Sequence, residues 1–246
     1  METVLALIAG GFIGAALGLV GAGGAMLSVP ILMYGFGLDP KPATTAALAI
    51  VLLAALSGLI PKIQKKQVLY RDAFVIWGIG LITNLGFSSI VEQIPDAVIT
   101  TGFAGVLILA GVSMLRPPRL DEQKRMPFPV LVVLSLFIGT ITGLFGIGGG
   151  FIAIPVLVLY FGTPQIVAAG TSLLIISINS LTAFVGHRSQ WADVQWHIPI
   201  LIGASAIVIA QIASQLSHKT SPVLLRRAFA YLLFTISLFT VFKTYL

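Results

Sequence analysis

Long apolar runs separated by short polar stretches predict eight helical segments in two groups of four. The expected segments cover residues 3–36, 43–60, 73–91, 97–115, 128–161, 166–186, 197–215 and 223–242. Several of these runs reach the roughly 20 residues that an α-helix needs to cross about 30 Å of hydrocarbon. The pattern therefore predicts an all-α polytopic membrane protein.

The leading segments of the two groups are copies of one another. Residues 12–32 (FIGAALGLVGAGGAMLSVPIL) and 137–157 (FIGTITGLFGIGGGFIAIPVL) are identical at ten of 21 positions, at a constant offset of 125. Between the groups lies the proline-bearing polar stretch RPPRLDEQKRMPFP. We therefore expect a first repeat over 1–115, a polar cytoplasmic linker over 116–129 and a second repeat over 130–246.

Each leading segment is too long for a single straight span. Its 34 residues would extend roughly 50 Å as one helix. A Gly-x-Gly-Gly sequence interrupts it near the middle, and a proline follows six residues later. This predicts two half-helices that meet at the glycines and return to the face they entered from, which is a re-entrant hairpin. Such duplicated, broken segments point to the substrate site of a secondary transporter.

The charges of the loops favour two inverted repeats, each with a re-entrant hairpin and three spans. If both leading segments are re-entrant, eleven of the fourteen Lys and Arg residues lie on one face, which the positive-inside rule makes cytoplasmic. If both cross fully, the best split is ten to four, so this count alone does not decide. Equivalent loops, however, carry opposite bias. The loop around 62–71 has four bases and its counterpart 187–196 has one, whereas loop 92–96 has none and its counterpart has three.

Composition limits the chemistry that the chain can perform. Hydrophobic residues make up 57% of it, charged residues 9%, and the mean hydropathy is +1.05. The net charge of +6 lies in loops, which favours membrane orientation over nucleic-acid binding. There is no cysteine, and no Asp, Glu, Lys, Arg or His lies in the middle of an apolar run. The three histidines lie at loops or segment ends. We therefore expect no catalytic residue, no metal site and no cofactor.

Backbone amides at the broken helices are the first candidates for binding a solute. The second half of each hairpin begins with amides that have no intrahelical acceptor and carry the positive end of the helix dipole. Two such starts near the middle of the membrane would form an anion site without charged residues. The candidates are Gly21, Gly23 and Gly24 in the first hairpin and Gly146, Gly148, Gly149 and Gly150 in the second. For Gly14, Gly18, Gly139 and Gly143, close helix packing is the favoured explanation.

Small polar side chains are the second group of candidates. Thr44 and Thr45, and likewise Thr171 and Ser172, open the helix after each hairpin. Their hydroxyls either cap that helix or donate to an anion, and the sequence favours neither role. Asn84, Asn179 and Gln211 lie inside apolar spans, where bonding between helices is the more usual role and donation to substrate the alternative.

These motifs resemble the TauE/SafE, or sulfite exporter, family of membrane transporters. The resemblance rests on the paired sequences GLVGAGGAMLSVPIL and GLFGIGGGFIAIPVL, on GTSLL at Gly170–Leu174, and on the four-plus-four arrangement. It covers essentially the whole chain. One departure is that Thr45-Ala46-Ala47 stands where the second repeat has Gly170-Thr171-Ser172, which makes the two half-sites unequal.

The resemblance implies a secondary transporter in the cytoplasmic (inner) membrane of a bacterium or archaeon. Its substrate would be a small sulfur-containing oxyanion, such as sulfite or an organosulfonate, moved by alternating access. Carried onto matching positions, the substrate region would be Gly21–Gly24, Gly146–Gly150, Thr171 and Ser172. Members work in export and in uptake, so neither direction nor coupling ion follows, and the sequence does not indicate an oligomeric state. The alternatives are a passive anion channel and a non-transporting membrane assembly protein.

Overall fold

The computed structural model describes residues 2–21, 23–90, 94–115, 127–145, 153–154, 157–158, 162–217 and 221–245. Within them the secondary structure is helical, without a β-strand. The helices of the first half are α1 (Glu2–Val20), α2 (Gly23–Pro30), η1 (Ile31–Gly35), α3 (Pro40–Gln64), α4 (Tyr70–Ile90) and α5 (Asp96–Leu115). Those of the second half are α6 (Phe128–Phe145), α8 (Gln165–Gly186), η3 (Arg188–Asp193), α9 (His197–Leu216) and α10 (Pro222–Tyr245).

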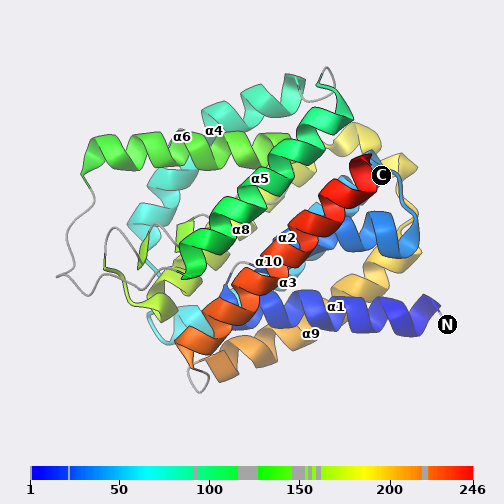
Figure 1. Ribbon diagram of the computed structural model, residues 1–246. Helices are drawn as coiled ribbons and strands as arrows, with labels where there is room; N and C mark the ends of the chain where they lie inside the picture. The colour runs from blue at the N-terminus through cyan, green and yellow to red at the C-terminus, as the bar shows by residue number, and fades with distance from the viewer. Residues whose placement is uncertain are drawn as a thin grey trace.

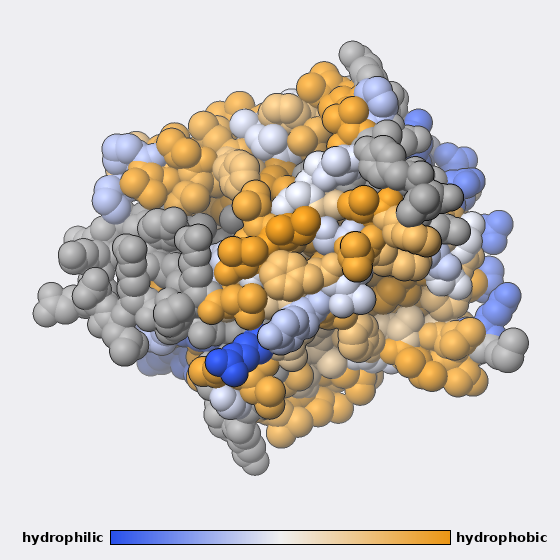
Figure 2. All heavy atoms as spheres, viewed as in Figure 1, coloured by the Kyte–Doolittle hydropathy of each residue, from blue (hydrophilic) through white to orange (hydrophobic). Residues whose placement is uncertain are grey.

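The predicted segments are confirmed to within a few residues wherever the structure describes them. Four of the described helices are long and apolar enough to cross a membrane: Glu2–Val20, Lys41–Gln64, Gln165–Gly186 and His197–Leu216. Large apolar side chains are also exposed on the outer helices, among them Ile82, Leu109 and Leu238 at 73%, 67% and 74%. Figure 2 shows hydrophobic residues dominating the middle of this face. Such a surface suits a lipid environment, and the protein is a multi-pass membrane protein.

The leading segment of the first half is broken, as the glycines predict. α1 ends at Val20, Gly21 has a φ of +85°, and α2 begins at Gly23. A methyl group on Gly24 would overlap the carbonyl oxygen of Ile13 and lie 2.6 Å from Cγ of Leu17. The chain therefore turns back, and α2 packs against the helix that precedes it.

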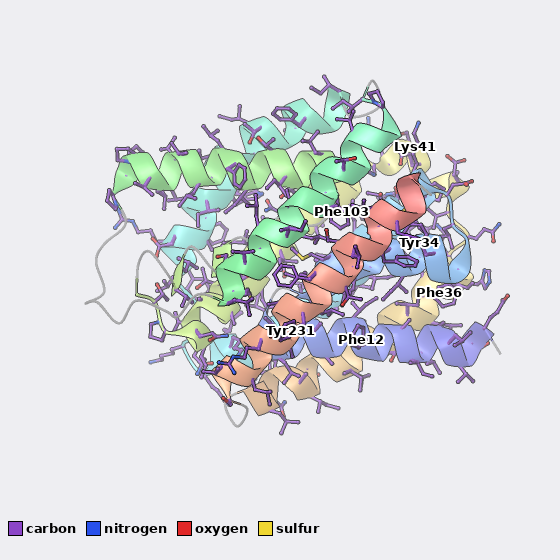
Figure 3. The ribbon with its side chains drawn as sticks, viewed as in Figure 1. Phe12, Tyr34, Phe36, Lys41, Phe103 and Tyr231 are labelled. Atoms are coloured by element: carbon purple, nitrogen blue, oxygen red, sulfur yellow. The ribbon has the colours of Figure 1, made fainter. Side chains whose placement is uncertain are left out.

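The two arms of this hairpin are unequal, which differs from the predicted pair of half-helices. α1 has 19 residues and extends about 28 Å, almost the thickness of the hydrocarbon core. The returning arm consists of α2 and the π-helical turn η1, which together cover residues 23–35. Figure 3 shows Tyr34, near the end of this arm, beside α10, where its ring meets Phe239 edge-on at 5.3 Å.

The second hairpin lies mostly outside the described residues, but the turn that ends it matches the turn that ends the first hairpin. Gly37 has a φ of +69° and Gly162 a φ of +59°, at the repeat offset of 125. Leu38 N donates to Leu32 O at 3.1 Å, and Thr163 N donates to Leu157 O at 3.0 Å. The two repeats thus share a local structure as well as a sequence.

Helices of the two halves interleave. α1 packs on α9, α4 on α6, α3 on both α8 and α9, and α5 on α10. In Figure 1, α5 runs from upper right to lower left, and α10 runs beside it in the opposite direction. α3 and α8 also run in opposite directions. The start of α3 is hydrogen-bonded to the segment after α8, and the start of α8 is hydrogen-bonded to the segment after α3.

Glycines allow the closest of these contacts. A methyl group on Gly14 would lie 2.5 Å from Ala206 O, and one on Gly18 would overlap Ala210 O, both on α9. One on Gly139 of α6 would overlap Gly80 O of α4. The predicted packing role of Gly14, Gly18 and Gly139 is therefore confirmed.

Candidate functional site

The turn of the first hairpin meets the start of α8. A methyl group on Gly21 would lie 2.6 Å from the Cβ and 2.7 Å from the Cα of Ala169. Gly21 is buried, and its φ of +85° lies in the left-handed region that glycine tolerates best. The predicted turn residue thus lies next to the predicted hydroxyl pair of the second repeat.

The start of α8 is in turn fixed by the turn between α3 and α4. A methyl group on Gly170 would overlap the carbonyl oxygen of Gln67. The Thr171 hydroxyl donates to Val167 O at 2.8 Å and accepts from Leu69 N at 3.0 Å. Thr171 and Ser172 are fully buried. Gly21, Thr171 and Ser172 therefore gather at what we call the Lys62 end of the bundle, defined by Lys62, Leu69, Thr171 and Ser217.

Thr45 lies at the opposite end of α3. Its buried hydroxyl is 3.1 Å from Lys41 O, 3.1 Å from Gln190 Oε1 and 3.2 Å from His187 Nδ1. The hydroxyl has a single proton, which the two oxygens share, whereas Nδ1 of His187 can donate to the hydroxyl oxygen. We call this region, defined by Asp39, Thr45, His187 and Gln190, the Thr45 end.

The predicted hydroxyls therefore do not form one pocket. Thr45 and Lys62 are seventeen positions apart on α3, which is about 26 Å along a helix. At the repeat offset of 125, Thr171 is one position away from the equivalent of Thr45, and each of the two threonines contacts a connecting segment of the other repeat. They occupy corresponding places at opposite ends of the α3–α8 pair.

The other candidates are spread through the helices. Asn84 on α4 and Asn179 on α8 are buried, at 1% and 4% exposure, whereas Thr44 and Gln211 are half-buried. Gly23 begins α2, and Gly24 lies against α1. Gly146, Gly148, Gly149 and Gly150 lie outside the described residues. For all of these positions, binding to substrate stays a prediction.

The prediction that Lys62 is one of the cations of a loop is wrong. α3 continues through Pro61 to Gln64, and Lys62 is only 2% exposed. Its Nζ donates to Ser217 Oγ, near the end of α9, at 2.6 Å. Nothing in the sequence distinguishes it from the exposed Lys65 and Lys66, because its burial comes from α8 and α9 of the other repeat.

No group of three or more potential metal ligands occurs in the part of the chain that the structure describes. The site at the Lys62 end consists of backbone, hydroxyl groups and one ammonium group. Such donors suit an anion better than a metal ion.

The chain is similar to known membrane transporters. A "Probable membrane transporter protein" of Xylella fastidiosa is 27% identical over 251 residues, covering 98% of this chain and 96% of the relative. The "Probable membrane transporter protein YunE" of Bacillus subtilis is 26% identical over 247 residues, covering 89% and 90%. "Sulfite exporter TauE/SafE family protein 6" of Arabidopsis thaliana is 40% identical over 88 residues, covering 34% and 20%. The family model "Sulfite exporter TauE/SafE" matches residues 6–240, so the chain belongs to this family of membrane transporters.

Proposed function

We propose that the protein is a secondary transporter that moves small sulfur-containing anions, such as sulfite or organosulfonates, across the cytoplasmic membrane by alternating access. The observation that carries the proposal is the contact between the first hairpin and α8. There the backbone turn at Gly21 lies against Ala169, directly before the buried hydroxyls of Thr171 and Ser172. A discontinuous helix whose second half begins at the site is typical of the substrate region of a secondary transporter.

Inverted repeats would supply two such regions. Equivalent helices α5 and α10 run in opposite directions (Figure 1), and so do α3 and α8. The hairpins end in equivalent turns at Gly37 and Gly162. Thr45 and Thr171 contact corresponding connections at opposite ends. These relations support a pseudo-two-fold axis in the membrane plane, which would let each repeat shape the site on one face.

In this proposal the hairpins bind the anion, and the surrounding spans open its binding site to the two faces of the membrane in turn. The α3–α8 pair crosses the molecule between the two ends, each closed by contacts between repeats. Breaking the contacts at one end while keeping those at the other would expose the site to one face at a time. The hydrogen bonds of Thr45 and Thr171 are then gates as well as candidate binding groups.

Transport by the purified protein in liposomes tests the proposal. The panel is sulfite, sulfate, sulfoacetate, taurine and acetate, each measured as uptake into vesicles preloaded with the same solute, with protein-free vesicles as the control. We expect saturable exchange of sulfite or a sulfonate and little exchange of acetate. Exchange of acetate without any sulfur anion would refute the substrate class. Currents far above transporter turnover in a planar bilayer would indicate the channel, and no flux of any anion would indicate the assembly protein.

A further inference from the structure

Lys62 is a buried cation that the proposed function leaves unused. Its side chain lies in the corner between α3, the start of α8 and the end of α9, with 2% of its surface exposed. Ser217 Oγ, at 2.6 Å, is the one acceptor of its Nζ among the described residues, and none of their carboxylates pairs with it. An ammonium group has three donors, so Ser217 satisfies one of them.

Ser217 is not a counter-charge. Its hydroxyl donates to Ser214 O at 2.8 Å, and Ser214 Oγ donates to Gly58 O at 2.7 Å. This chain of hydroxyls connects α9 to α3 but stays neutral. Burying an ammonium group in a membrane protein is costly unless an anion or a full set of acceptors compensates it.

The position of Lys62 connects it to the proposed substrate region. A methyl group on Gly170 would lie 3.2 Å from Cβ of Lys62. Gly170 stands between Ala169, which meets the hairpin turn at Gly21, and Thr171. The carbonyl of Lys62 also accepts from Gln67 N at 2.9 Å, which fixes the turn that contacts the start of α8.

We propose that Lys62 binds the anionic substrate and supplies the positive charge of the site at the Lys62 end. This inference rests on the proposed function. A sulfite or sulfonate oxygen would accept from Nζ and replace Ser217 as its partner, and the anion would compensate the buried charge. A single ammonium group also suits a transporter because it attracts an oxyanion as a point charge without the bidentate geometry of arginine.

The test compares Lys62→Met with Lys62→Arg, using Lys65→Met, at the exposed residue directly after the same helix, as the matched control. KM and maximal rate of sulfite and sulfoacetate exchange are measured in liposomes, and anion-dependent thermal stabilisation is measured in detergent. We expect Lys62→Met to raise KM at least about tenfold, the loss of one charged contact, and to abolish the stabilisation by sulfite. Lys62→Arg should retain part of both, and Lys65→Met should stay within about twofold of the native protein.

A purely structural Lys62 predicts another result. Lys62→Met would then change thermal stability while KM and the sulfite-dependent shift stayed at native values, and that result would overturn the inference. If Lys62→Met does not fold, Lys62→Gln provides the same readout with a polar side chain. If the native protein exchanges only another anion, the substrate class fails, but the role of Lys62 is still tested with that anion.

Discussion

Gly21 meets two requirements that no other residue type satisfies, a left-handed backbone and contact with Ala169. Gly37 has a similar φ of +69° but nothing within 4 Å of an added methyl group, so it is the matched control. We expect Gly37→Ala to lower the free energy of unfolding by about 1–2 kcal/mol, the cost of the left-handed region. Gly21→Ala should cost about 1–3 kcal/mol more from overlap. Denaturant unfolding in micelles measures both, and equal losses would contradict the contact.

Lys66 occupies a position where helices usually have glycine. Gln67 N donates to Lys62 O and Lys66 N to Ile63 O, while Lys66 has a φ of +54°. This is the Schellman arrangement. Lys66→Gly should therefore raise the free energy of unfolding by up to about 1 kcal/mol, because relief of strain exceeds the entropy gained by the unfolded chain. Lys65 has a φ of −90°, so Lys65→Gly relieves no backbone strain and should not raise the free energy of unfolding. A loss of stability in Lys66→Gly would show that the side chain contributes more than its backbone costs.

At the scale of single residues, the helix break was predictable from the sequence and the burial of a lysine was not. Gly21 was predictable because a break in a helix favours a residue without Cβ, and because the same glycine occurs in both repeats. Lys62 was not, because Pro61 and the following lysines suggest the end of a helix. Burial of a residue depends on its neighbours in space, and those of Lys62 include Gly170 and Ser217, which are 108 and 155 positions away.

At the level of helices, glycine contacts decide how α1 lies on α9. Gly14→Ala places a methyl group 2.5 Å from Ala206 O and 2.9 Å from Ala210 N, so the helices must separate. We expect a loss of about 1–3 kcal/mol in the free energy of unfolding. Gly11→Ala on the same helix meets Ser205 Oγ at an ordinary 3.6 Å and should be neutral or slightly stabilising, because alanine favours helix more than glycine. Similar losses of stability in both variants would contradict a packing role specific to Gly14.

Helix boundaries followed from the sequence because apolar runs and glycine breaks are local signals. The unequal arms of the first hairpin did not, since the depth of a turn depends on what it packs against. The π-helical turn at Ile31–Gly35 and the short helix at Arg188–Asp193 likewise have no periodic signal. The hydroxyl candidates lie one to two turns inside α3 and α8 and cap neither helix. Their separation to two ends follows from the antiparallel α3–α8 pair, which no local pattern records.

At the scale of the whole molecule, the cations of the loops predict how the bundle is oriented in the membrane. Lys65, Lys66 and Arg71 follow α3 at the Lys62 end, against Lys41 and Arg188 at the Thr45 end. The positive-inside rule therefore predicts that the Lys62 end faces the cytoplasm and the Thr45 end faces outside. A re-entrant first hairpin adds a stricter requirement, because Glu2 and Asp39 must then lie on the same face.

Cysteine labelling tests this requirement directly, since the sequence contains no cysteine. Single variants Glu2→Cys, Asp39→Cys, Asp193→Cys and Lys65→Cys all replace exposed residues. A membrane-impermeant maleimide added to intact cells should label the first three. It should label Lys65→Cys only after the membrane is opened, because α3 separates residues 39 and 65 by a full span. Labelling of Glu2→Cys and Asp39→Cys from opposite faces would mean that residues 3–36 cross the membrane completely, and both the inverted repeats and the proposed site would then be wrong.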